Sequence, residues 1–275
     1  MNLTDPPPVK VVWHAGGYAA NSTVQLNWAR ELIAQLALRG DEQVLDVGCG
    51  DGKITAEIAR ALPHGAATGT DIAPEMIAFA QQTFPATVAP NLQFQVADAR
   101  HLDPVVLGAN RFDVVFSNAA LHWVDDHAAF FRGAAAVLKT GGRLAVFSGG
   151  LGNAWDVFLA LRPEMRSPRW REFFQPLTRP YFFYPQSAYE AWLPAAGFRR
   201  DRLELATINT WYDGADGLAT WLRVTWLPYV QRVPANLREE FIAAVTRRYL
   251  ASHPADAQGR VQVRMMRLEI AAVKI

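Results

Sequence analysis

The sequence is short of the features that mark several large classes of protein. It has a single cysteine, Cys49, so no disulfide can form within the chain, as is usual for proteins of a reducing compartment. No apolar run reaches the roughly 18 residues of a membrane-spanning helix, and the opening MNLTDPPPVK lacks the basic-then-apolar order of a signal peptide. The formal net charge of +1 excludes the strong basic field typical of nucleic-acid-binding proteins. We therefore expect a cytoplasmic protein that binds neither membranes nor nucleic acid.

Apolar residues, by contrast, are plentiful, at 51% of 275 residues against 19% charged residues, which is enough to build a large core. Between Val44 and Gly150, short β-branched runs alternate with segments of helical periodicity. This alternation predicts a parallel sheet covered by helices, in which ligands bind at the carboxyl ends of the strands. Residues 199–212 and 264–275 add two further strands that are expected to pair with each other. The predicted fold is therefore an α/β fold with a seven-stranded, mostly parallel sheet.

A glycine-rich loop follows the first predicted strand, in the stretch VLDVGCGDGKIT. Gly48 and Gly50 fit the dinucleotide-binding pattern G-x-G-x-x-G. The last position of that pattern is occupied by Lys53, however, and the third glycine comes early, at Gly52. The spacing therefore does not favour a pyrophosphate ligand such as NAD.

Two carboxylates in the same loop, Asp46 and Asp51, point to the charge of the ligand. At such short range they would repel a pyrophosphate and attract a cation. S-adenosylmethionine (SAM) carries a sulfonium and an ammonium group on a nucleoside. We therefore predict SAM as the cofactor, with S-adenosylhomocysteine as its product.

Carboxylates also follow the next two predicted strands. Asp71 ends the second strand, where it can accept hydrogen bonds from both ribose hydroxyls, and Asp98 ends the third, where it can accept the adenine amino hydrogen. Ile72 and Met76 would form apolar walls for the adenine. A single aspartate at a strand end is often only a turn or cap residue. Three carboxylates at consecutive strand ends, beside the glycine loop, together favour one cofactor site.

The stretches VLDVGCGDG, GTDIAPEMIAFAQ, VADAR and FDVVFSNAALHW resemble the successive motifs of class I SAM-dependent methyltransferases. The resemblance covers about residues 40–150 and implies a Rossmann-like sheet with a C-terminal antiparallel strand. It assigns Asp46, Gly48, Gly50 and Gly52 to the loop around the methionine part of SAM, Asp71 to the ribose, Asp98 and Ala99 to the adenine, and Asn118 to the strand edge near the transferable methyl group.

The segment SNAALHW and the aromatic residues after it resemble a narrower group. This group includes the trans-aconitate, juvenile hormone acid and malonyl-carrier-protein O-methyltransferases, which methylate a carboxylate on a small molecule or on a carrier-bound acyl group. The resemblance places Tyr18, Gln25 and Trp123 at the border of the active site. It implies O-methylation of a free or carrier-bound carboxylic acid.

Such a reaction makes few demands on catalytic groups. A carboxylate is already ionised at neutral pH and needs no general base, so the enzyme must mainly align the acceptor and exclude water. We expect an aromatic pocket with a few donors, and an arginine would clamp a second carboxylate of the acceptor. The candidates are Gln25, His122 and Trp123 as catalytic residues, and Tyr18, Asn153, Arg223, Trp226 and Tyr229 as substrate-binding residues.

His122 leaves alternatives open. It could be the base for a nucleophile of higher pKa, or a ring that only packs beside Trp123. A required base would favour a C- or N-methyltransferase of a small metabolite, and a filled lid without turnover would favour a SAM-binding protein without methyl transfer. His122 and His127 are five residues apart and offer no convincing metal set, so no metal is expected.

The chain after Gly150 is expected to contribute a helical lid. Arg264 and Arg267 interrupt the apolar face of the last strand and are expected to point to solvent or toward the lid. The predicted organisation is an N-terminal helical segment over the active site (1–40), a SAM-binding core (41–150), a lid insertion (151–186), a core helix and strand (187–213), lid helices (214–258) and a terminal core strand (259–275).

Overall fold

The computed structural model describes residues 23–176 and 180–275, and these residues form two compact units. The core unit consists of the described residues of Trp13–Leu151 together with Tyr181–Ala206 and Arg267–Ile275. The helical unit consists of Gly152–Pro180 and Thr207–Met266, without the three residues outside the description. Tyr18 lies outside the described residues, so its predicted role at the acceptor stays a prediction.

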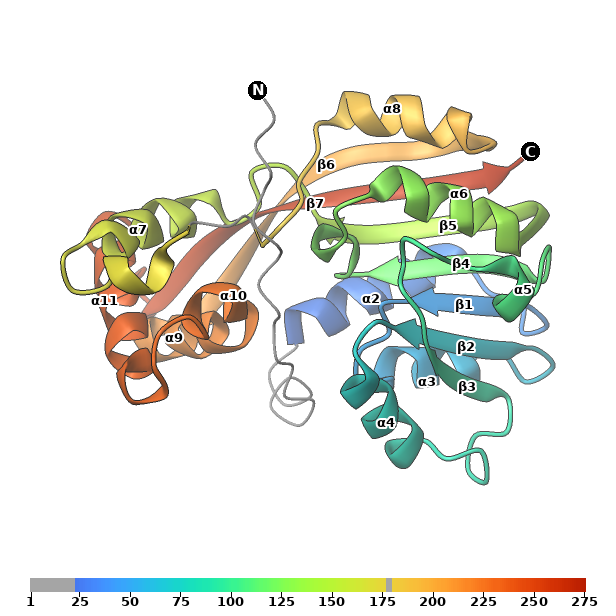
Figure 1. Cartoon of the computed structure of the whole chain (residues 1–275), viewed down its shortest axis with the longest axis horizontal. Coiled ribbons are helices and arrows are strands. Elements are labelled where there is room, and N and C mark those ends of the chain that lie inside the picture. The colour runs from blue at the N-terminus through green and yellow to red at the C-terminus, as the bar shows by residue number, and fades with distance from the viewer. Residues whose placement is uncertain (1–22, 177–179) are drawn as a thin grey trace. The chain divides into compact units, whose positions relative to one another are not determined.

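A seven-stranded sheet with the order β3-β2-β1-β4-β5-β7-β6 forms the framework of the core unit (Figure 1). Neighbouring strands among β1 to β5 pair in parallel, whereas β7 pairs antiparallel with β5. The predicted mostly parallel sheet with an antiparallel C-terminal strand is thus confirmed. The strands are β1 (Gln43–Val47), β2 (Ala66–Asp71), β3 (Leu92–Val96), β4 (Phe112–Asn118), β5 (Leu138–Gly149), β6 (Phe198–Asp213) and β7 (Arg260–Lys274).

Burial explains the sequence pattern of these strands. The central strands β1 and β4 are buried at nearly every position, because helices cover both faces of a parallel sheet. The edge strand β3 instead alternates between buried and exposed residues at its start. Since β3, β2 and β1 are neighbours with parallel directions, their carboxyl ends lie at one edge of the sheet.

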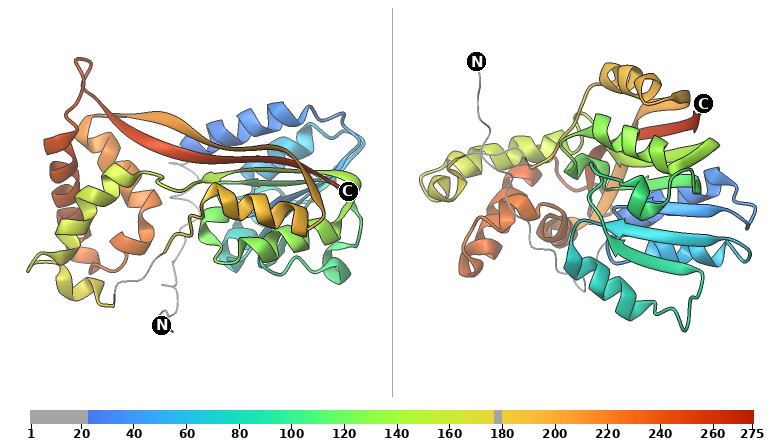
Figure 2. Two further views of the ribbon diagram at one scale, coloured as in Figure 1. Left: turned by 90° about the horizontal axis from the view of Figure 1, so that it is seen from above. Right: turned by 45° about the vertical axis from the view of Figure 1, so that its right-hand side comes forward.

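Helices cover the two faces of this sheet. Figures 1 and 2 show α2 and α3 on one face and α6 and α8 on the other. Local signals set the helix starts: Pro74 opens α4 at its first turn, and the Asp126 carboxylate caps α6 by accepting a 2.8 Å hydrogen bond from the amide of Ala129. The helices are α2 (Thr23–Leu36), α3 (Lys53–Arg60), α4 (Pro74–Thr83), α5 (Pro104–Leu107), the 3-10 turn η1 (Leu121–Trp123), α6 (His127–Val137) and α8 (Gln186–Ala195).

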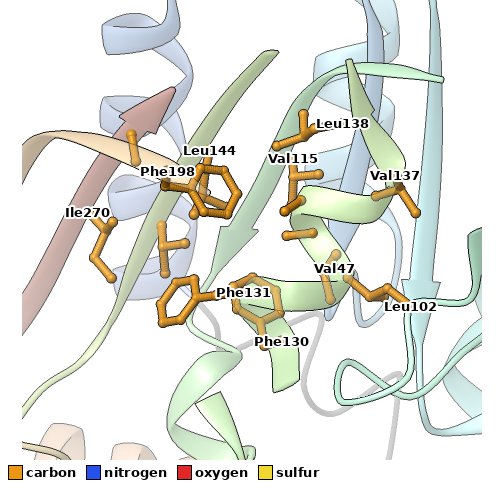
Figure 3. Close-up of a cluster of buried hydrophobic side chains, with 14 of the residues drawn as sticks. Val47, Leu102, Val115, Phe130, Phe131, Val137, Leu138, Leu144, Phe198 and Ile270 are labelled. Carbon is orange, nitrogen blue, oxygen red and sulfur yellow. The ribbon is translucent and has the colours of Figure 1, made fainter. Parts of the chain in front are cut away.

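The main apolar cluster lies between the sheet and helix α6 (Figure 3). Phe130 and Phe131 of α6 are fully buried, with ring centroids 5.3 Å apart in an edge-to-face arrangement. They pack in one cluster with Val115 of β4, Leu144 of β5 and Ile270 of β7. The cluster therefore joins α6 to strands β4, β5 and β7.

The burial of Arg267 in β7 contradicts the prediction that this side chain is exposed. Its side chain is only 4% exposed, and its guanidinium lies 4.0 Å from the centroid of the Phe147 ring. It donates two hydrogen bonds of 2.7 and 2.8 Å to Glu31 of α2, and two of 2.8 and 2.5 Å to Glu269. The expectation was wrong because Glu31 of α2 lies beside this position of β7 and supplies the buried arginine with a carboxylate. Arg264, in contrast, is exposed as expected and pairs with Asp156.

The helical unit includes most of the region 151–186 predicted as a lid insertion and all of the predicted lid helices at 214–258, and their role as a lid stays a prediction. Its core includes Trp170 and Phe174, each with a ring centroid 5.3 Å from that of Phe241. The core unit resumes at Tyr181, earlier than the predicted end of the lid insertion at residue 186. In the described chain no helix is both long and apolar enough to cross a membrane. The elements are α7 (Trp155–Arg166), η2 (Arg171–Phe174), α9 (Gly214–Thr225), α10 (Leu227–Val230), η3 (Ala235–Leu237) and α11 (Arg238–Ser252).

Candidate functional site

The glycine loop after β1 has a backbone that other residues would strain. Gly48, Gly50 and Gly52 all have positive φ angles, of 81°, 55° and 78°. The amide of Gly48 donates a 2.7 Å hydrogen bond to the carbonyl of Thr70 in β2. A side chain on Gly48 would place its Cβ only 2.2 Å from the Cβ of Ala120, which follows β4. The loop is therefore held tightly at the carboxyl ends of β1, β2 and β4.

Two carboxylates are buried in and beside this loop. Asp46 is 2% exposed, and its Oδ2 accepts a 2.7 Å hydrogen bond from the hydroxyl of Thr55. Asp51 is 3% exposed, and the Lys53 ammonium lies 3.3 Å from its Oδ2. Buried carboxylates are rare unless they are paired or serve a ligand.

The electrostatics of this group favour a bound cation. The pKa of Asp46 is raised to about 7, mainly by burial and further by the nearby charges of Asp71 and Asp51, against the opposing hydrogen bond from Thr55. Burial also raises the pKa of Asp71. A positively charged ligand would relieve this repulsion, so the residues fit the sulfonium and ammonium groups of SAM.

Asp71 connects the glycine loop to the start of α4. Its Oδ2 accepts a 3.0 Å hydrogen bond from the amide of Gly50, and its Oδ1 accepts one of 2.9 Å from the amide of Ala73. Each oxygen keeps a lone pair for a ribose hydroxyl. Ile72 beside it is 59% exposed, as an apolar wall for adenine requires, whereas Met76 is 3% exposed and packs into the core unit.

Asp98 is already engaged by a neighbouring cation. The Arg100 guanidinium donates from Nε to both carboxylate oxygens of Asp98, at 3.1 and 3.0 Å, and also reaches Asp125 at 3.1 Å. Burial raises the pKa of Asp98, but the hydrogen bonds and charge of Arg100 outweigh it and hold the pKa below its ordinary value. An adenine amino group would share this carboxylate with Arg100. Ala99 is half-buried and packs against the apolar cluster.

Asn118 at the end of β4 lies next to Gln25 of α2. The Asn118 side chain donates a 2.9 Å hydrogen bond from Nδ2 to the backbone carbonyl of Gln25. Its Oδ1 is buried and has no hydrogen-bond partner among the residues that the structure describes. The next residue, Ala119, has a φ angle of 54°, which strains a non-glycine backbone. The predicted place of Asn118 near the transferable methyl group stays a prediction.

An aromatic group surrounds His122 in η1. Its ring centroid lies 5.4 Å from that of Trp123, 6.0 Å from Tyr181 and 6.3 Å from Phe183. Burial lowers the pKa of His122 to about 3, helped by the charge that His127 would carry, so the ring is neutral at physiological pH. The sequence reasoning did not single out Tyr181 or Phe183, although the aromatic run YFFY was a visible signal.

The other acceptor candidates belong to the helical unit. Asn153 Oδ1 accepts a 3.1 Å hydrogen bond from the amide of Met266, and Arg223 donates to both oxygens of Glu239 at 2.8 and 2.7 Å. Trp226 and Tyr229 are buried, with 7% and 6% exposure and ring centroids 5.5 Å apart. The roles of these four residues at an acceptor stay predictions.

Known proteins match both the sequence and the fold. The family model described as a methyltransferase domain matches residues 45–146. Trans-aconitate 2-methyltransferases of Rhodopseudomonas palustris strains BisB5 and BisA53 are 28% and 30% identical to this chain, each over 95% of this chain and 99% of the relative. The solved structure of Haemonchus contortus phosphoethanolamine N-methyltransferase 2 in complex with S-adenosyl-L-methionine is 17% identical, with a TM-score of 0.60 over 98% of this chain and 61% of that one.

These matches agree with the sheet order and with the glycine loop at the end of β1. The relatives span nearly the full length of this chain, so the match includes the regions beyond the matched domain. The predicted family and the predicted enzyme class are confirmed. The chain therefore belongs to the class I SAM-dependent methyltransferases, in the family that includes the trans-aconitate 2-methyltransferases.

Proposed function

We propose that this methyltransferase esterifies a carboxylate of a small organic acid, using SAM as the methyl donor. The observation that carries the cofactor assignment is the group of carboxylates around the glycine loop. Asp46 and Asp51 are buried and Asp71 is half-buried, and burial together with the neighbouring negative charges raises the pKa of Asp46. The similarity to trans-aconitate 2-methyltransferases supports a carboxylate as the acceptor. A free acid and a carrier-bound acid are both compatible with this proposal.

SAM, when bound, supplies a methyl group that is activated by the positive sulfur. The carboxylates of Asp46 and Asp51 would face its positive groups across the glycine loop. Asp71 would bind the ribose, and Ile72 would cover one side of the adenine. Asp98 would accept the adenine amino hydrogen while it stays paired with Arg100.

The acceptor side of the core unit is suited to an anion that needs no deprotonation. His122 is neutral and surrounded by aromatic rings, and Gln25 lies next to Asn118 at the end of β4. A carboxylate is ionised without help at neutral pH, so alignment and exclusion of water are the main tasks of the surrounding residues. An amine or carbon acceptor would instead need a group that removes a proton.

Calorimetric titration of the full chain with SAM, S-adenosylhomocysteine and NAD tests the cofactor. Binding of the two adenosyl ligands without binding of NAD supports the proposal, and the reverse result contradicts it. A methyl-transfer assay then compares trans-aconitate, monocarboxylic acids, carrier-bound acids and amines. Formation of a methyl ester supports the acceptor class, whereas turnover of amines alone would replace it with N-methylation.

A further inference from the structure

The His122 ring is fixed by hydrogen bonds from the end of β5. The hydroxyl of Ser148 accepts a 3.0 Å hydrogen bond from the backbone amide of His122 and lies 2.9 Å from the ring atom Nδ1. The amide of Gly149 donates a 3.3 Å hydrogen bond to the same Nδ1. Both partners of Nδ1 therefore come from two successive residues of one strand.

These contacts decide which ring nitrogen carries the proton. A backbone amide can only donate, so Nδ1 must accept from Gly149 and cannot carry a hydrogen itself. The Ser148 hydroxyl, which already accepts from the His122 amide, is then free to direct its own hydrogen at Nδ1. In a neutral imidazole the remaining proton must lie on Nε2.

The surroundings of Nε2 differ from those of Nδ1. Among the described residues, none accepts a hydrogen bond from it, and the rings of Trp123, Tyr181 and Phe183 surround the imidazole. A neutral N–H donor in aromatic surroundings suits an anionic oxygen, and a hydrogen bond to a charged acceptor is among the stronger ones.

We propose that Ser148 and Gly149 hold His122 as its Nε2–H tautomer and that this N–H donates a hydrogen bond to the carboxylate of the acceptor. The inference rests on the proposed function, because it takes the acceptor to be an acid. It gives His122 the role of a donor and excludes the role of a general base, which would need a free lone pair at Nε2. A carboxylate becomes an ester without losing a proton, so no base is required. The lowered pKa of His122 agrees with a ring that stays neutral.

Two substitutions of His122 distinguish the role of a hydrogen-bond donor from that of a general base. His122→Gln places an amide N–H near the position of Nε2, whereas His122→Asn can replace only the contact at Nδ1. We expect His122→Asn to lower kcat/KM for the best acid by roughly 10- to 100-fold, the scale of one hydrogen bond to a charged group. His122→Gln should retain at least about a third of the activity, since its amide still donates.

The exposed His64, which precedes β2 at the opposite edge of the sheet, supplies the control His64→Gln, with no expected change. Ser148→Ala should lower kcat/KM a few-fold through the loosened ring, and Ser148→Thr should restore it. Equal loss of activity in His122→Gln and His122→Asn would overturn the donor role.

The ring nitrogens of the isotope-labelled full chain give a readout besides activity. Nitrogen-15 NMR should show His122 with an unprotonated Nδ1 and a protonated Nε2, unchanged between about pH 6 and 8, where an ordinary histidine titrates. A protonated Nδ1, or titration in that range, overturns the inference even if acids are methylated. The expected spectrum without turnover of any acid would overturn the proposed function and leave the tautomer established.

Discussion

Replacement of Asp46 by asparagine should stabilise the protein without ligand and weaken its binding of SAM. Asp46 is 2% exposed, and burial is the main reason that its pKa rises from the ordinary value of 3.8 to about 7. Ionised Asp46 therefore destabilises the folded protein, and only a positively charged ligand would compensate this cost. Asparagine has nearly the same shape, carries no charge and can still accept the hydrogen bond from Thr55.

The size of the effect follows from the two pKa values. Above pH 7, ionised Asp46 costs the folded state about 4 kcal/mol relative to the unfolded chain. The cost shrinks as the pH falls from about 7 toward about 4, because the folded protein then retains the proton and the unfolded chain does not. A weaker hydrogen bond to Thr55 offsets about 1 kcal/mol of the gain. The net stabilisation by Asp46→Asn should be about 3 kcal/mol at pH 8 and about 1 kcal/mol at pH 5.

Urea denaturation of the ligand-free protein at pH 8 and pH 5 measures this difference. The matched control is Asp41→Asn, whose carboxylate is 63% exposed and which should change stability by less than about 0.5 kcal/mol. Calorimetry should show at least roughly tenfold weaker SAM binding by Asp46→Asn, the scale of a charged contact. The electrostatic reasoning is refuted if Asp46→Asn unfolds at a lower urea concentration than the parent protein at pH 8.

Three further substitutions test other parts of the structure. Asp71→Ala should weaken SAM binding by about 1–3 kcal/mol in calorimetry, and unchanged binding would remove Asp71 from the ribose site. Arg267→Ala should lower the free energy of unfolding in urea by about 3 kcal/mol, because it leaves the buried carboxylate of Glu269 with Arg202 as its cation; adding Glu269→Gln should recover part of this loss. Gly48→Ala should lower the free energy of unfolding in urea by at least about 2 kcal/mol, since its Cβ would lie 2.2 Å from that of Ala120. A variant as stable as the parent protein would show that the loop can move.

The framework of the candidate cofactor site was predictable from the sequence because its signals are local. A buried strand, three closely spaced glycines and a carboxylate at the strand end all lie within the 12 residues from Val44 to Thr55. The order of β3, β2 and β1 in the sheet then brings the carboxylates of Asp46 and Asp71 to one edge. The pairing of Asp98 was also visible, since Arg100 follows it by two residues.

The contacts of Arg267 in β7 could not be predicted, because its partner in α2 is distant in the chain. Arg267 was expected to be exposed because it interrupts the apolar face of the last strand, and its partner Glu31 is 236 residues away. The packing of His122 has a similar origin, since Ser148 and Tyr181 come from segments 26 and 59 positions later. Sequence patterns describe which face of an element is apolar, but they do not show which other segment supplies the neighbouring polar group.

The two strands at the end of the sheet also set how this gene could be recombined with those of its relatives. β6 passes from the core unit to the helical unit between Ala206 and Thr207, and β7 returns between Met266 and Arg267. The two crossing points are adjacent, since the Thr207 hydroxyl lies 3.5 Å from the Met266 sulfur. Transplanting 152–180 alone would therefore divide the helical unit, whereas exchanging it together with 207–266 would move that unit intact. A chimera built at these junctions would retain the cofactor-binding strands of one parent and acquire the helices of the other.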